Sequence, residues 1–141
     1  MKSLIVYAHP WDGSFNHQVL LDTKAHLEAK GDIVDVIDLH KDGFNPILDQ
    51  ESLKVFAQGE YVDPIAADYA KRLKAADNIV FVFPIWWYGP PAILKGFFDK
   101  VFLKNHTYNQ NEKGEMTGIL TGKTASALTT ANIDQESLKN F

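Results

Sequence analysis

Residues 79–91, IVFVFPIWWYGPP, decide the fold class of this chain. The first five are β-branched or aromatic and uncharged, which is typical of a strand buried at the centre of a parallel sheet. Pro90 and Pro91 then open a helix, because proline is well tolerated in the first helical turn. That helix carries a wide apolar face made of Ile93, Leu94, Phe97, Phe98, Val101 and Phe102. Its three phenylalanines are expected to be core or interface residues and not cofactor contacts. A buried strand followed by such a helix is typical of α/β proteins.

The same alternation continues on both sides of this stretch. Further strands are predicted at 4–8, 33–39 and 124–130, with helices from Ser14 to about Lys30 (ended by Gly31), from Asp49 to Phe56 and from Asp63 to Ala76. Asp35 and Asp38 favour an edge position for 33–39, and with Asp42 they are expected to form a solvated edge. The polar residues 104–122 predict an excursion that could include a hairpin. Right-handed crossovers then favour a flavodoxin-like, doubly wound parallel sheet of strand order 2-1-3-4, in one α/β domain over residues 1–141.

The composition of the chain limits the partners and reactions that can be expected of it. The chain has 141 residues and a net charge of −4, which gives no reason to expect a nucleic-acid partner. It contains no cysteine, so thiolate catalysis and iron–sulfur ligation are excluded and any redox chemistry needs a bound cofactor. The histidines lack ligand spacing, so no metal site is expected. No apolar stretch approaches the roughly 20 residues of a membrane helix, and the expected location is cytoplasmic, without membrane insertion.

Ligands of an open parallel sheet bind beyond the carboxyl ends of its strands. The loop at 9–16 leads into a helix, whose N-terminus attracts phosphate, and His9, Ser14 and Asn16 add side-chain hydrogen-bonding groups. An equally open interpretation is that Ser14 only caps the helix and His9 only closes a turn. The loop at 129–132 adds hydroxyls and an amide, although a plain surface turn is the stronger interpretation there.

The loop at 84–91 is more informative. Trp86, Trp87 and Tyr88 are three adjacent aromatic residues that can wall a planar ligand, while backbone groups of the loop hydrogen-bond the ring edge. Their N–H groups would stabilise a reduced, anionic ring. The alternatives are a hydrophobic plug or a dimer contact.

Three stretches together resemble the NAD(P)H dehydrogenase (quinone) family, the diaphorase-like enzymes of flavodoxin fold. They are LIVYAHPWDGSFNH at 4–17, ADNIVFVFPIWWYGPPAILKGFFDKVF at 76–102 and LTTAN at 128–132, and the similarity covers essentially the whole chain. The resemblance implies a homodimeric flavoprotein that passes hydride from NAD(P)H through FAD, or FMN in some relatives, to quinone-like acceptors. By motif, the flavin contacts would be His9, Ser14, Phe15, Asn16, Pro84, Ile85, Trp86, Trp87, Tyr88, Thr129 and Thr130.

The chain departs from that family at two places. Ala131 and Asn132 stand where the family has a glycine pair, and no residue after Asn132 matches the family's catalytic tyrosine and histidine, so the catalytic residues stay undetermined. Family members also continue through a fifth strand and a last helix, so the strand at 124–130 is expected to be an uncovered edge and the chain to be truncated relative to them. Two alternatives remain: a flavin-binding ancillary subunit of the potassium-efflux type with little activity, and a one-electron carrier like flavodoxin itself.

Overall fold

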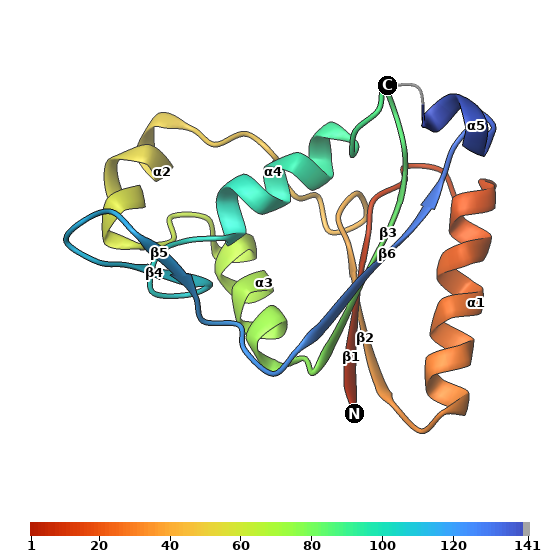
Figure 1. Ribbon diagram of the computed structural model, residues 1–141, viewed down its shortest axis with the longest axis horizontal. Coiled ribbons are helices and arrows are strands. Elements are labelled where there is room, and N and C mark those ends of the chain that lie inside the picture. Colours follow the sequence, from red (N-terminus) through yellow and green to blue (C-terminus); the bar gives the residue numbers. More distant parts are fainter. Residues whose placement is uncertain (140–141) are drawn as a thin grey trace.

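The computed structural model, which describes residues 1–139, is built on a sheet of four parallel strands (Figure 1). The strands are β1 (Lys2–Tyr7), β2 (Ile33–Asp38), β3 (Asn78–Pro84) and β6 (Thr124–Thr130), in the order β2-β1-β3-β6. All three pairings are parallel. This confirms the predicted flavodoxin-like order, with the aspartate-bearing strand at one edge and the apolar strand in the interior of the sheet.

Helices cover both faces of the sheet. Figure 1 shows α1 (Phe15–Ala29) on one side and α3 (Pro64–Ala75) with α4 (Ala92–Val101) on the other. Alternate residues of β1 explain this arrangement, because Ile5 and Tyr7 pack with Leu20 of α1 while Leu4 and Val6 face the cluster around α3 and α4. Phe97 of α4 is fully buried in that second cluster, as expected for a core residue.

Smaller elements lie outside the sheet. They are α2 (Gln50–Val55), the 3-10 helix η1 (Phe56–Gln58), the antiparallel hairpin of β4 (Tyr108–Gln110) and β5 (Met116–Gly118), and α5 (Gln135–Leu138). The hairpin falls inside the predicted excursion. In the described part of the chain no helix is both long and apolar enough to cross a bilayer.

The helix starts follow from local chemistry. Ser14 accepts a hydrogen bond from the backbone N–H of His17 at 3.0 Å, and Asp49 accepts one from Ser52 at 2.9 Å. Each bond satisfies one of the amides that a helix leaves unpaired at its N-terminus. Gly31 follows α1 with a φ of +90°, the left-handed conformation that glycine adopts readily. The predicted capping residues are therefore confirmed.

The solvated edge expected at Asp35 and Asp38 of β2 and at Asp42 in the loop that follows is only partly correct. Arg72 of α3 donates from Nε and Nη2 to the two carboxylate oxygens of Asp35, both at 2.7 Å, and Tyr69 Oη donates to Asp42 at 2.8 Å. The Arg72 hydrogen bonds hold the pKa of the Asp35 carboxyl below its usual value. These carboxylates tie the edge strand to the helix that covers it, so an edge position does not leave them free in water.

The other edge of the sheet is β6. It pairs with β3 on one side, and no second strand borders it among residues 1–139. All but the last of its residues are exposed, and Leu128 retains 39% of its accessible surface. Within residues 1–139, the segment 124–130 is therefore an edge strand of the sheet.

Candidate functional site

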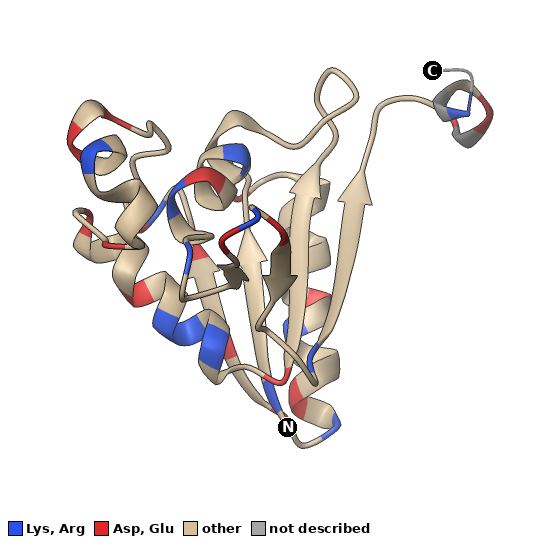
Figure 2. Cartoon of the chain, turned by 60° about the vertical axis from the view of Figure 1, so that its left-hand side comes forward, with Lys and Arg blue, Asp and Glu red and all other residues tan. Residues whose placement is uncertain are grey.

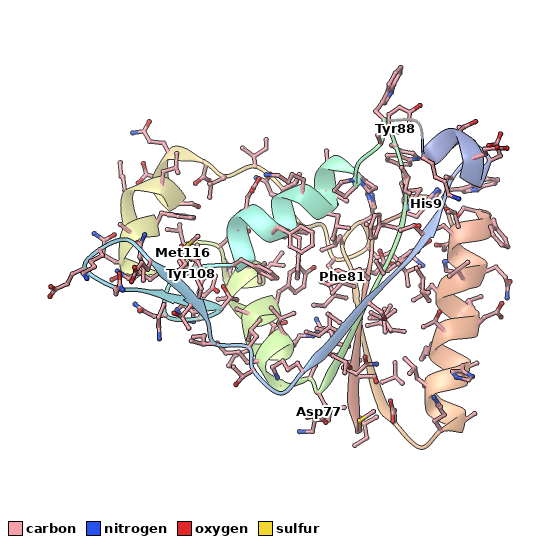
Figure 3. The ribbon with its side chains drawn as sticks, in the orientation of Figure 1. His9, Asp77, Phe81, Tyr88, Tyr108 and Met116 are labelled. Carbon is pink, nitrogen blue, oxygen red and sulfur yellow. The ribbon has the colours of Figure 1, made fainter. Side chains whose placement is uncertain are left out.

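A cavity of about 350 Å³ opens at the carboxyl ends of β1, β3 and β6. Its volume lies within the roughly 300–1,000 Å³ range of small-molecule sites. Figure 3 shows His9 and Tyr88 at this end of the sheet and Asp77 at the opposite end. The lining comes from all three predicted loops: His9, Trp11, Gly13, Ser14, Phe15, Asn16, Pro84, Ile85, Trp86, Thr130, Ala131 and Asn132.

Asn16 links the first loop to the third. Its side chain, 1% exposed, donates from Nδ2 to Thr130 Oγ1 at 3.1 Å, a bond between residues 114 positions apart. Its Oδ1 is buried and accepts no hydrogen bond within the described chain. Because buried acceptors are normally satisfied, this oxygen calls for a donor from a ligand or from water.

His9 has a defined ring orientation. Its Nδ1 accepts a hydrogen bond from the backbone N–H of Trp11 at 3.1 Å, and its ring meets the Trp86 ring edge-on with centroids 5.9 Å apart. An accepting Nδ1 leaves the proton of the neutral imidazole on Nε2. His9 thus closes a turn, as one interpretation held, and still carries an N–H donor in the cavity wall.

Residues 86–89 form a tight two-residue turn. Trp86 N–H donates to Gly89 O at 3.0 Å and Gly89 N–H donates back to Trp86 O at 3.1 Å. Trp87 and Tyr88 both have positive φ, +49° and +62°, which identifies a type I′ turn. The Trp86 N–H is consumed by this turn, so the expectation that it faces a ligand ring is wrong. Trp87 N–H donates to no group within residues 1–139.

A second cavity of about 210 Å³ adjoins the first. It shares Ile85, Ala131 and Asn132 with the larger cavity and adds Trp87, Tyr88 and Ile133. Ten of the eleven sequence-predicted residues therefore line one of the two cavities. Thr129 lines neither, because it precedes Thr130 on the strand and its side chain points to the other face.

The charged side chain of Asp12, in the loop that leads into α1, has charged or ionisable neighbours. Asp12 lies 2.9 Å from Lys41 Nζ and 3.6 Å from His17 Nδ1, and the hydrogen bond from Lys41 lowers the pKa of the Asp12 carboxyl. The loop at 84–91 carries no charged residue (Figure 2). In the part of the chain that the structure describes, no three His, Asp or Glu side chains are grouped to hold a metal ion.

Trp11 and Gly13 line the cavity although the sequence reasoning did not select them. A signal was present, because both lie in the loop between the first strand and the helix that follows it. The position of the loop before a helix predicts phosphate-binding groups, and that pattern gives no reason to select an apolar ring.

Comparison with known proteins identifies the class to which this fold and site belong. A family model described as flavodoxin-like fold matches residues 1–140, so the chain belongs to that family. An uncharacterized NAD(P)H oxidoreductase of Haemophilus influenzae is 34% identical over the whole chain, which spans 69% of that relative. NAD(P)H dehydrogenase (quinone) 1 of Rattus norvegicus is 31% identical over 92% of the chain, which spans 53% of that enzyme.

A solved structure gives the same result. The NAD(P)H:quinone oxidoreductase from Methanothermobacter marburgensis superimposes with a TM-score of 0.87 at 29% identity, over 99% of this chain and 71% of that one. The resemblance inferred from the three sequence stretches is confirmed by these relatives.

Proposed function

We propose that this chain forms the flavin site of an NAD(P)H:quinone-type oxidoreductase. The observation that carries the proposal is the cavity of about 350 Å³ at the carboxyl ends of three parallel strands, walled by aromatic residues at one end and by a helix N-terminus at the other. The names of the relatives supply the reaction class, and the chemistry of the lining residues is consistent with it.

The residues present fit a flavin. A planar ring needs apolar walls, which Ile85 and Trp86 supply, and a phosphate needs unpaired amides, which the first turn of α1 supplies after Ser14. Asn16 Oδ1 is a buried acceptor that receives no hydrogen bond from residues 1–139, and the hydroxyls of a ribityl chain are donors of the required kind. The proposed cofactor is FAD, with FMN as the alternative.

A bound flavin would supply two-electron hydride chemistry between NAD(P)H and a quinone, and the second proton of the quinol would come from solvent. The groups of the chain itself would bind and orient the flavin. The Trp87 N–H would donate to the ring edge and His9 Nε2–H to the phosphate or ribityl end, while the aromatic walls exclude water. Donors fixed before charge develops stabilise that charge without reorganisation.

The proposal extends to assembly and location. Trp87 is 97% exposed beside the second cavity, and an aromatic side chain left in water next to a ligand site is typical of an interface. We therefore propose a homodimer in which the partner completes the walls of the site. We also propose a cytoplasmic location, where the proposed reductant NAD(P)H is available.

Flavin binding tests the proposal directly. The purified chain should take up FAD or FMN and gain the yellow flavin absorbance, and it should then oxidise NADH or NADPH in the presence of menadione. Ser14→Ala should weaken flavin binding, since it alters the proposed phosphate end. Asp49→Ala is the matched control, because it removes an N-cap of the same geometry from α2, away from the cavity, at a similar cost of about 1 kcal/mol.

The outcomes separate the candidate functions. A colourless protein after incubation with both flavins would reject the flavin site. Bound flavin without NAD(P)H oxidation would reject the enzyme and favour the ancillary-subunit alternative. Equal losses of flavin affinity in the two variants would show that the loss reflects general destabilisation and that the phosphate end does not depend on Ser14.

A further inference from the structure

Trp11 is an exposed aromatic side chain at the phosphate-binding end of the larger cavity. It is 67% exposed and lines the cavity together with Gly13 and Ser14. The ring contacts proposed above lie mainly in the loop that follows β3, so this indole has no part in them. An exposed tryptophan within a ligand cavity calls for an explanation, because large aromatic groups are costly to leave in water.

The backbone of Trp11 is fixed by hydrogen bonds within its own loop. Its backbone N–H donates to His9 Nδ1 at 3.1 Å, and its backbone carbonyl accepts from the backbone N–H of Ser14 at 3.2 Å. The indole lies directly against Gly13, where a Cβ atom would sit only 2.4 Å from Cζ2 and 2.5 Å from Cε2. The absence of a side chain at Gly13 therefore leaves room for the ring to fold back onto the loop beside the start of α1.

The cavity thus has aromatic surface on two different loops, with a helix N-terminus beside the second. Trp86 belongs to the loop after β3, and Trp11 belongs to the loop that enters α1. A dinucleotide has the matching chemistry, since it carries two planar groups joined through a pyrophosphate. Stacking on an aromatic side chain is available to any base, because every base presents a π-face.

We propose that Trp11 is a stacking platform for the adenine of FAD and makes this site prefer FAD to FMN. The inference rests on the proposed flavin site and assigns Trp11 as its specificity-determining residue. FMN lacks the adenylate half and would make no such contact. Trp11 should therefore contribute to the affinity for FAD and have no effect on the affinity for FMN.

The test is a comparison of two dissociation constants. The full chain, freed of bound flavin, is titrated with FAD and separately with FMN by isothermal calorimetry, as wild type, Trp11→Ala and Trp11→Phe. Base stacking on an aromatic side chain is worth about 1–3 kcal/mol, which corresponds to a roughly 5- to 140-fold weaker FAD affinity in Trp11→Ala. The FMN affinity should change less than about twofold, and Trp11→Phe should retain most of the FAD affinity.

The outcomes distinguish this inference from the function on which it rests. Wild-type protein that binds neither flavin contradicts the proposed function itself. If it binds flavin, equal weakening of FAD and FMN in Trp11→Ala overturns the adenine assignment and shows that the indole contacts the part common to both. An unchanged FAD affinity overturns it as well. A circular-dichroism melt of each variant checks that affinity was compared between folded proteins.

Discussion

The turn at 86–89 permits a sharp test of the backbone geometry at the cavity. Trp87 has a φ of +49°, a conformation that costs a residue with a Cβ atom roughly 1–2 kcal/mol. Its side chain is 97% exposed, so truncation removes little packing. Trp87→Ala keeps the Cβ atom and the strain, whereas Trp87→Gly removes both and Trp87→Asn introduces a residue that enters the left-handed region more readily.

The expected difference follows from two opposing contributions. Glycine relieves about 1–2 kcal/mol of strain but loses about 0.4–1 kcal/mol through the greater entropy of the unfolded chain. The Gly variant should therefore be about 0.5–1 kcal/mol more stable than the Ala variant. The Asn variant should also be more stable than the Ala variant. All three variants lack the indole, so the difference among them reports the backbone alone.

Urea unfolding of the flavin-free chain measures this difference. With a slope of about 1–3 kcal/mol per molar, the midpoint of the Gly variant should lie roughly 0.2–1 M above that of the Ala variant. Equal midpoints for the Gly, Asn and Ala variants would refute the reasoning, since a relaxed position gains nothing from residues that tolerate positive φ. A confirmed difference would show that strain is retained at the proposed site, as is common where function requires it.

Two further predictions concern ion pairs away from the cavity. Lys100, with a side chain 4% exposed, lies 2.5 Å from Asp63 and donates to Asn45 O, so Lys100→Met should lower the free energy of unfolding by about 3 kcal/mol in urea titration. The double variant that adds Asp63→Asn should recover part of that loss of stability. A loss below about 1 kcal/mol in Lys100→Met alone would contradict the prediction. Because the pKa of Asp35 is lowered by Arg72, the stability that this pair contributes is complete above the unfolded pKa of about 3.9 and is lost as pH falls through the lower folded value. Asp35→Asn should thus lower the free energy of unfolding by about 0.5–1 kcal/mol at pH 7 and by progressively less below pH 4, as measured by thermal melts. A loss of stability that does not change with pH would rule out the charge pairing as its origin.

Local chemistry explains why so much of the fold was predictable. The apolar run of β3, the caps at Ser14 and Asp49, and the carboxylates of β2 each act within a few residues, and each produced the expected element. The sheet order then followed from the handedness of crossovers and from edge chemistry. The expectation of a solvated edge went wrong where two partners from α3, Arg72 for Asp35 and Tyr69 for Asp42, were not visible in the local pattern.

The candidate site shows the same division between features set by local sequence and features set by tertiary structure. The sequence by itself determined which loops meet at the carboxyl edge, because parallel strands bring their ends to one edge whatever their separation along the chain. The choice of side chains expected to contact a flavin came from the resemblance of the same sequence to a known family. Only the tertiary structure decided that Asn16 bonds Thr130, that Trp11 folds against Gly13, and that the Trp86 N–H is used inside a turn. Those outcomes depend on the dihedral angles of single residues and on the packing of segments distant in sequence, which no local pattern of residue types encodes.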